Sequence, residues 1–400
     1  MIPRIKPYFN HKEIFAAFRA GHNAVEEFEK KAASKFKTKY GVAFLYGRSG
    51  LYALLKCMGI KDSEVIMPAY TCVVAANAVA YSGNIPRFVD ISLDNYSMDL
   101  DLLEKALNNR TKAIIGTSLF GYPYDADRLK EIIKRSGREI LLIQDCAHSL
   151  GAECNGRLLC NIGDAALFAF SINKEISSIY GGMIVTNSEE IYERLKKYRD
   201  GNFGAPSVSQ KLKMLSLLLT SYTAFFNPFY GITNFLERNT AILDPITKYY
   251  KEDVIDMPKD FLDKLPAVNA GIGDIQLDKY DAIKDTHRAI AKLYSEELKN
   301  LKVIALPRMI EGATYLYCTL LINNRERFTK YMRKKGIQIG DYIPYAIPYM
   351  KAHKKYKIGD YPNSLLCSQN IINLPCHPSL SRNELSRIIR CTTDYFTDES

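Results

Sequence analysis

The 400-residue sequence lacks the features that mark secreted, metal-binding or repetitive proteins. Its nine cysteines form no Cys-x-x-Cys pair, and Cys154 and Cys160 lack the spacing and the companion ligands of a zinc site. The charged N-terminus is not followed by the apolar core of a signal peptide, and no internal repeat or low-complexity segment is present. We therefore expect a cytoplasmic protein with reduced cysteines and no bound metal.

The chain also lacks a compact basic arm and any known nucleic-acid-binding motif, although it is basic overall. Its 54 Lys and Arg residues exceed its 44 Asp and Glu residues, which gives a formal net charge of +10 that is spread along the chain. Such a charge favours partners that carry a nucleotide phosphate, or an anionic membrane surface. Nucleic acid is not expected as a partner.

What the sequence does contain is an alternation of short apolar runs and helical patterns. With 47% hydrophobic and 24% charged residues, the chain is large enough for two domains. Residues 40–205 form the expected large domain, where the alternation predicts an α/β fold with a mostly parallel sheet covered on both faces. The runs that are typical of buried strands lie at 64–68, 87–90, 113–116, 140–143, 165–170 and 181–186.

Three further segments complete the predicted organisation. Residues 1–39 are an N-terminal helical segment, 206–260 an apolar helical insertion, and 261–400 a long helix followed by a small α+β domain. In detail we predict helices at 11–37, 70–81, 125–135, 273–298 and 325–335, a strand at 314–322, and a closing helix that begins with the capping box Ser381-Arg-Asn-Glu384.

The residues with the clearest chemical meaning lie between Ile140 and Thr186. Asp145 ends one apolar run and Lys174 follows another, so both should lie on one edge of one sheet, where α/β proteins place their chemistry. Such a pair suits pyridoxal phosphate: the lysine joins covalently to the aldehyde of the cofactor, and the aspartate keeps the pyridine nitrogen protonated. Taken singly, lysine and aspartate are more often solvated surface residues, so the surrounding motifs decide the assignment.

A second candidate site lies earlier, in the segment Tyr46-Gly-Arg-Ser-Gly50. This glycine-containing turn precedes a helical run, and the backbone N–H groups at the start of a helix bind phosphate. On its own the pattern has low specificity.

The order of these motifs resembles the DegT/DnrJ/StrS-type sugar aminotransferases, which are pyridoxal phosphate enzymes of fold type I. The resemblance covers nearly the whole chain apart from about 205–260, and it implies a large domain with a seven-stranded-type sheet, a small C-terminal α+β domain, and a homodimer. The motifs that carry it lie at 62–68, 88–90, 95–99, 110–114, 145–152, 155–157, 163–166, 174, 181–182, 185–187 and 374–378.

The resemblance also implies roles for individual residues. Lys174 corresponds to the lysine that binds the cofactor, Asp145 to the partner of the pyridine nitrogen, and His148 to a residue near the phenolic oxygen. The start of the helix after the glycine turn corresponds to the phosphate site. The other cofactor-binding residues that it indicates are Gly47, Arg48, Ser49, Tyr70, Cys72 and Ser171.

The sequence departs from the family pattern at several of these positions. Arg48 replaces a neutral residue of the phosphate loop, and Ala169 stands where a phosphate-binding serine is usual. Cys72 replaces a ring-stacking aromatic residue, so either Tyr70 takes over that role or the cofactor ring is less covered. The Asn-x-Arg-Met stretch that contacts the phosphate of the neighbouring subunit is not recognisable at 262–266, and Asp341-Tyr-Ile-Pro344 replaces a His-Tyr-Pro motif.

These observations predict an aminotransferase that moves an amino group from glutamate or glutamine to a keto-sugar, for amino-sugar or cell-surface polysaccharide biosynthesis. The keto-sugar is expected to be nucleotide-linked, and Lys174 to move the proton at the substrate carbon. One alternative is a pyridoxal phosphate-binding regulatory protein without turnover, which the altered phosphate loop favours. Another is a membrane-associated enzyme with a lipid-linked keto substrate.

The second alternative depends on residues 214–236, which carry no charge. Asn227-Pro228 and Gly231 interrupt this run, which predicts two short helices that meet at a bend. These helices either pack on the protein itself or its dimer partner, or dip into one leaflet of a membrane as an interfacial hairpin. In the latter case, the side chains that enter first are Phe225, Phe226, Phe229 and Tyr230.

Overall fold

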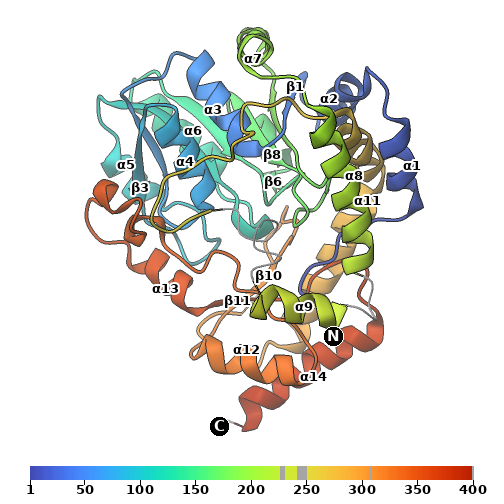
Figure 1. Ribbon diagram of the computed structural model, residues 1–400. Coiled ribbons are helices and arrows are strands. Elements are labelled where there is room, and N and C mark those ends of the chain that lie inside the picture. Colours follow the sequence, from blue (N-terminus) through green and yellow to red (C-terminus); the bar gives the residue numbers. More distant parts are fainter. Residues whose placement is uncertain (226–229, 241–249, 307, 399–400) are drawn as a thin grey trace.

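The computed structural model describes residues 1–225, 230–240, 250–306 and 308–398. Its centre is a seven-stranded sheet in the order β1-β9-β8-β5-β4-β2-β3 (Figure 1). All neighbours from β8 to β3 pair in parallel, and β9 is antiparallel to both of its neighbours, which confirms the predicted α/β class. The strands are β1 (Tyr40–Phe44), β2 (Glu64–Pro68), β3 (Ile85–Val89), β4 (Thr111–Thr117), β5 (Leu141–Asp145), β8 (Ala165–Ala169) and β9 (Gly182–Thr186).

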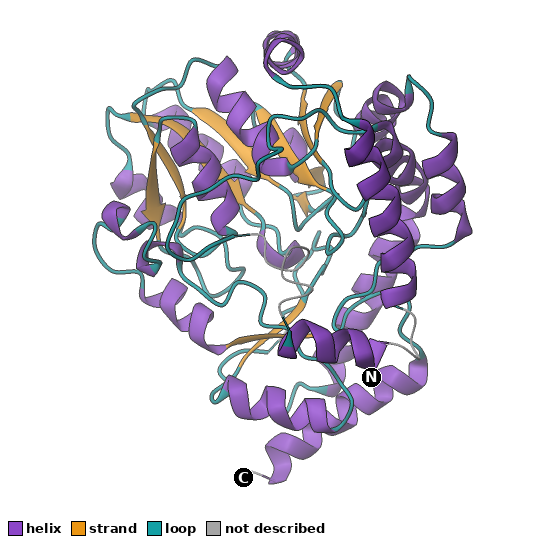
Figure 2. Cartoon of the chain, viewed as in Figure 1, coloured by secondary structure: helices purple, strands orange, loops and turns teal. Residues whose placement is uncertain are grey.

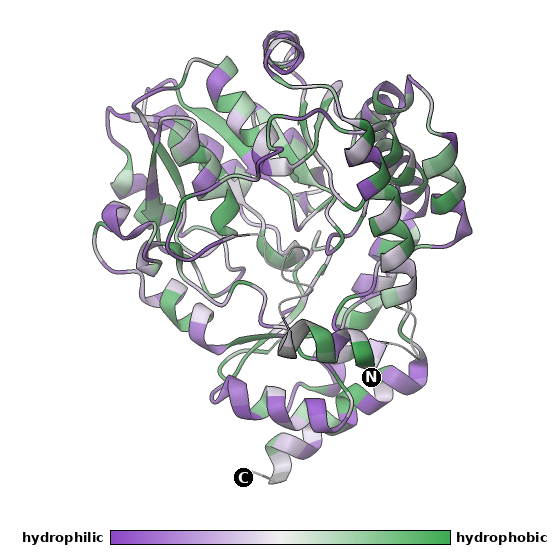
Figure 3. Ribbon diagram, viewed as in Figure 1, coloured by the Kyte–Doolittle hydropathy of each residue, from purple (hydrophilic) through white to green (hydrophobic). Residues whose placement is uncertain are grey.

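The strands are apolar on both faces because helices cover both faces (Figure 2). In β2, Val65 and Met67 belong to a core shared with α3, α4 and α7, whereas Ile66 between them belongs to a second core shared with α2, α5, α6 and α11. Figure 3 shows the hydrophobic residues concentrated in the central strands. The helices of the large unit are α3 (Gly47–Cys57), α4 (Val73–Tyr81), α5 (Leu100–Ala106), α6 (Ala126–Arg135) and α7 (Glu189–Asn202).

Helices from the two ends of the large unit pack together on the second core. The helix predicted over 11–37 is in fact two helices, α1 (His11–Arg19) and α2 (Ala24–Lys35), because the chain turns at Gly21. Both lie against α11 (Ala267–Glu297), which begins six residues before the predicted start. Its first turn is held by Asn269, whose Nδ2 donates to the carbonyls of Ser178 (2.8 Å) and Tyr180 (3.1 Å).

The smaller α+β unit lies below the sheet in Figure 1. The strand predicted over 314–322 is confined to β10 (Cys318–Leu321), whose antiparallel pairing with β11 (Ile371–Leu374) extends over only these four positions. Thr314 and Tyr317 instead donate their N–H groups to the carbonyls of Gly121 and Phe120 in the large unit. The helices of this unit are α12 (Arg325–Lys334), α13 (Pro362–Asn370) and α14 (Arg382–Asp398).

The uncharged segment forms two helices, α8 (Val208–Ala224) and α9 (Tyr230–Asn239), as the sequence predicts. Asn227 and Pro228, like Phe226 and Phe229, lie outside the described residues. Tyr230 does not have the exposed position that a membrane-entering side chain needs: it is 4% exposed, and its hydroxyl donates to Oε1 of Gln338 at 2.6 Å. In the part of the chain that the structure describes, no helix combines the length and the hydropathy needed to cross a bilayer.

Candidate active site

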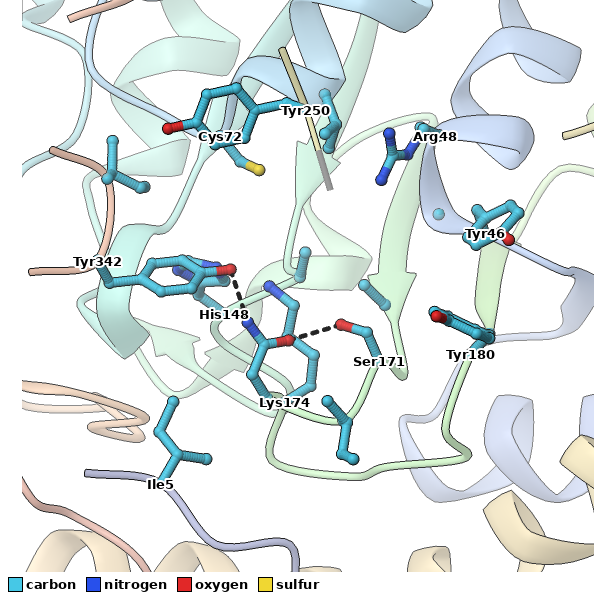
Figure 4. A pocket seen from close by; sticks show the side chains of 18 of the residues that line it. Ile5, Tyr46, Arg48, Cys72, His148, Ser171, Lys174, Tyr180, Tyr250 and Tyr342 are labelled. Atoms are coloured by element: carbon cyan, nitrogen blue, oxygen red, sulfur yellow. Dashed lines mark hydrogen bonds between the residues drawn. The ribbon is translucent and has the colours of Figure 1, made fainter. Parts of the chain in front are cut away.

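Asp145 and Lys174 lie at the same edge of the sheet because β5 and β8 are parallel neighbours. Asp145 is the last residue of β5, and Lys174 follows β8 by five residues. Both line a cavity of about 850 Å³, within the range of ligand pockets. Seven of the nine predicted site residues line it, namely Gly47, Arg48, Cys72, Asp145, His148, Ser171 and Lys174 (Figure 4).

The amine of Lys174 is prepared for chemistry by its surroundings. Removal from water lowers the pKa of Lys174 to about 8, and the opposing influence of Cys72 and Asp145 is smaller. Its Nζ lies 5.8 Å from the centre of the Tyr342 ring. Near neutral pH a larger fraction of this amine is unprotonated than in an ordinary lysine, which makes it a competent nucleophile and base.

Asp145 and His148 are buried beside Lys174. Burial raises the pKa of Asp145, while the N–H of Ala147, which donates to its Oδ1 at 3.0 Å, and the charge of Lys174 oppose this shift. Burial, together with the charge of Lys174, lowers the pKa of His148 well below its ordinary value, so its imidazole is neutral. Nδ1 of His148 accepts a hydrogen bond from the N–H of Phe120 at 3.4 Å.

Residues 170–181, between β8 and β9, form the lysine loop. A relay of hydrogen bonds that sequence reasoning missed holds this loop (Figure 4). Oγ of Ser171 donates to Oδ1 of Asn173 (2.7 Å), and Nδ2 of Asn173 donates to the hydroxyl of Tyr342 (2.9 Å). Tyr317 donates to the carbonyl of Asn173 (3.1 Å), and its ring stacks on Tyr342 with 4.8 Å between centres. Asn173 stands next to Lys174 in the sequence, but nothing local indicates that residues 317 and 342 meet it.

The carboxyl group of Glu175 also holds the lysine loop, through a hydrogen bond to the segment after β5. Its Oε2 accepts the N–H of Leu150 at 2.9 Å, which joins the segment after Lys174 to the segment after Asp145. Burial raises the pKa of Glu175 to about 8, so much of it is protonated at neutral pH. Sequence reasoning missed this residue as well, although its position directly after Lys174 was a signal.

The glycine turn lies where the sequence predicts, at the start of α3. The N-cap residue Tyr46 makes no side-chain capping bond, and the guanidinium of Arg48 lies 5.7 Å from the ring of Tyr46. A Cβ atom added to Gly182 would lie 2.2 Å from the backbone nitrogen of Gly47, so only glycine lets β9 approach this turn. A Cβ atom on Gly47 would lie 3.5 Å from Cβ of Ala169. Ala169, which stands where the family usually has a phosphate-binding serine, therefore lies beside the turn.

Two of the predicted site residues do not line the cavity. Tyr70 is fully buried, and its hydroxyl donates to the carbonyl of Ile343 at 3.0 Å, so its ring does not reach the place expected for the cofactor ring. Tyr250 and Tyr342 are among the aromatic residues that line the cavity instead (Figure 4). Ser49 lies in the first turn of α3 behind the lining, and its Oγ is buried.

The family assignment follows from a comparison over most of the chain. The model of the DegT/DnrJ/EryC1/StrS aminotransferase family matches residues 15–217 and 247–393. The chain belongs to this family. The DegT/DnrJ/EryC1/StrS resemblance predicted from the motifs is thereby confirmed, and the chain is a pyridoxal phosphate-dependent aminotransferase.

Several known enzymes match the chain almost end to end. The GDP-perosamine synthase of Escherichia coli O157:H7 is 25% identical over 384 residues, covering 94% of this chain and 91% of that enzyme. The dTDP-3-amino-3,6-dideoxy-alpha-D-galactopyranose transaminase of Aneurinibacillus thermoaerophilus is 27% identical over 376 residues, covering 93% and 90%. Among solved structures, the aminotransferase TlmJ from Streptoalloteichus hindustanus superposes with a TM-score of 0.79 at 20% identity over the full length of both chains, which confirms the fold.

The residues of this aminotransferase fit its cofactor. Among the described residues that line the cavity, Thr71 and Thr117 have hydroxyls that are buried without a hydrogen-bond partner. Unpaired buried hydroxyls are costly unless a ligand satisfies them. Together with an amine at Lys174, a carboxylate at Asp145 and a guanidinium at Arg48, they match the aldehyde, the ring nitrogen and the phosphate of pyridoxal phosphate.

The described residues offer no comparable site for a metal. All nine cysteines are free thiols, and within the described ranges no three His, Cys, Asp or Glu side chains are grouped so that they could hold a metal ion.

Proposed function

We propose that this aminotransferase transfers the amino group of glutamate or glutamine to a nucleotide-linked keto-sugar, in the synthesis of an amino sugar for a polysaccharide. The observation that carries the proposal is the pair of Lys174 and Asp145 at one edge of the sheet, inside a cavity large enough for a cofactor and a substrate. The named relatives support the acceptor class, since their names include GDP-perosamine and a dTDP-linked amino sugar.

Each residue of the site has a distinct part in this proposal. Lys174 would hold the cofactor through its aldehyde, and the lowered pKa of its amine suits it to move the proton at the substrate carbon. Asp145 would hold the proton on the pyridine nitrogen, and neutral His148 would lie near the phenolic oxygen of the cofactor. Gly47 and Arg48 would bind the phosphate at the start of α3. When bound, pyridoxal phosphate supplies a ring that withdraws electrons from the reacting carbon.

The relay of Ser171, Asn173 and Tyr342 keeps the lysine loop in place during these steps. Because Tyr342 belongs to the smaller unit, this relay also connects the two units across the cavity. Tyr317 adds a second connection to the backbone of Asn173. The lysine is therefore positioned by long-range contacts as well as by its strand.

Stepwise addition of the two substrates tests the proposal. Glutamate or glutamine is expected to remove the visible absorption band of the lysine-bound cofactor, and a dTDP- or GDP-linked keto-sugar is expected to restore it, because the amino group leaves the cofactor again. The measurement is the absorption spectrum of the purified protein after each addition. If neither amino acid changes the band, the regulatory alternative without turnover is favoured and the proposal is wrong.

A lipid-linked keto-sugar is the second candidate acceptor. It is favoured by large apolar side chains that remain exposed on α8 and α9, among them Leu212 (61%), Ile232 (60%) and Phe235 (62%). Such side chains beside the exposed Lys211 and Lys213 are typical of peripheral membrane contact. In the same assay, this candidate requires that only the lipid-linked substrate restores the band.

We further propose that the active form is a homodimer, as the family resemblance implies. The expected mass in solution is twice the 45.4 kDa of the chain, with an interface that buries well over about 2,000 Å². Light scattering coupled to size-exclusion chromatography at micromolar concentration measures this mass. A monomer that retains transaminase activity would contradict it.

A further inference from the structure

One wall of the active-site cavity is built by the α8–α9 hairpin, meaning the described residues of α8, Phe225 and α9. Leu217, Thr220, Ser221 and Ala224 line the cavity and are spaced as one face of a helix, and Phe225 follows them. From α9, Tyr230 and Thr233 reach the same cavity. The apolar segment therefore lies in contact with the space in front of Lys174.

The wall is anchored at its back to the lysine loop. Met214 and Leu218, on another face of α8, are fully buried in a cluster with Ile179, Val268 and Ile272. Ile179 lies five residues after Lys174 and has a φ of +71°, a left-handed conformation that β-branched residues rarely adopt. Because α8 and Ile179 share one buried cluster, the hairpin and this part of the loop are held in one arrangement.

The wall is also anchored at its far end. The hydroxyl of Tyr230 donates to Oε1 of Gln338 in the smaller unit, at 2.6 Å. Oγ1 of Thr233 donates to the carbonyl of Ala224 at 3.0 Å, which satisfies an acceptor in the last turn of α8. The hairpin therefore spans the cavity between the α1–α11 side of the large unit and the smaller unit.

The side chains of the wall differ in chemistry from the charged groups of Lys174, Asp145 and Arg48, which line the same cavity. None of the described hairpin residues that line the cavity carries a charge. Oγ1 of Thr220 donates to the carbonyl of Ser216 at 2.8 Å, so this hydroxyl, like that of Thr233, is already used by the backbone. Phe225 and Tyr230 form a stacked pair with 5.8 Å between ring centres. What the wall offers a ligand is mainly aliphatic and aromatic surface.

Of the amino donor and the nucleotide-linked acceptor, only the acceptor has a part that binds well to such a surface. A small, polar amino donor such as glutamate or glutamine gains nothing from uncharged, apolar side chains. A nucleotide-linked sugar carries a planar base far from its reacting carbon, and such bases bind by stacking on aromatic side chains. Beyond Leu217, the wall also lies in the segment 218–246, which the family model does not match, so it is a feature in which this chain differs from the family pattern.

We propose that the α8–α9 wall binds the base of the nucleotide-linked acceptor and thereby determines which acceptor is used. This inference rests on the proposed function, because it assumes that a nucleotide-linked keto-sugar is the acceptor. The wall acts through Leu217, Ala224 and Phe225, and it is supplied by the same chain as Lys174.

Two identical substitutions on opposite faces of α8 test the inference. Leu217→Asp places a charge on the cavity face, and Leu219→Asp places it on the outer face, where Leu219 is 46% exposed. Phe225→Ala removes the aromatic surface without adding a charge, so the test does not depend on one variant. The probes are dTDP and GDP, whose binding to the holoenzyme is measured by calorimetry, and the corresponding aminated nucleotide sugars, whose conversion is followed by the cofactor absorbance.

Phe225→Ala is expected to weaken nucleotide binding and to raise the KM for the nucleotide sugar about tenfold or more, since loss of one stacking contact has an effect of this size. Leu217→Asp is expected to act in the same direction, because it places a charge on the apolar surface. The half-reaction with glutamate should keep its rate, and Leu219→Asp should change neither reaction. The inference is wrong if the two cavity variants bind both nucleotides as the wild type does, or if they slow both half-reactions equally. A wild-type enzyme that does not react with glutamate would instead contradict the proposed function itself.

Discussion

Lys174→Ala is expected to remove the visible absorption band of the bound cofactor and to abolish transamination, by at least about 10⁴-fold. The substitution deletes both the amine that joins to the cofactor aldehyde and the base that moves the proton at the substrate carbon, and general acid–base catalysis alone contributes about 10²–10⁴-fold. Among the described residues that line this cavity, Lys174 is the lysine whose pKa is lowered. Its charge is also the one that acts on Asp145.

The absorption spectrum of the purified variant and a coupled glutamate assay measure the two effects. Lys61→Ala is the control, because the side chain of Lys61 is 75% exposed and lies outside the cavity. This control should keep both the band and the activity. A band that persisted in Lys174→Ala would show that another amine binds the cofactor, and the assignment of the site would be wrong.

Asp145→Asn is expected to leave the cofactor bound but to slow transamination by about 10²–10³-fold or more, the loss that follows removal of one group that stabilises transition-state charge. Asparagine keeps the shape of the side chain and can still accept the N–H of Ala147, but it cannot hold a proton on the pyridine nitrogen. Rapid-mixing kinetics with glutamate measure the rate.

A second readout of Asp145→Asn separates its charge from its shape. The negative charge of Asp145 raises the pKa of Lys174, so its removal should lower that pKa below about 8. The unprotonated amine then persists to lower pH, and cofactor capture by the apoenzyme should remain fast at lower pH than in the wild type. Asp62→Asn, at a side chain that is 80% exposed, should change neither quantity. Wild-type kinetics in Asp145→Asn would remove this residue from the catalytic machinery.

For residues 214–236, the sequence pattern predicts the secondary structure but not where the helices lie in the fold. The lack of charge in this segment and its interruption at residues 227–231 predict two helices, and α8 and α9 are such helices. The pattern is equally compatible with burial, membrane contact or a cavity wall, because all three need apolar side chains. Only the burial of Met214 and Leu218 in one cluster with Ile179, and the bond from Tyr230 to Gln338, places the cavity face of α8 in front of Lys174.

The sequence by itself determined the α/β class, the meeting of Asp145 with Lys174, and the glycine turn at the start of α3. Each depends on local information: strand ends, apolar periodicity and a turn that opens a helix, and parallel neighbours bring their carboxyl ends to one edge. The tertiary structure alone decided that Tyr70 points away, that β10 stops at four residues, and that Tyr317 and Tyr342 hold Asn173. These outcomes depend on contacts between residues as much as 273 positions apart, which packing across the whole chain selects and no local pattern encodes.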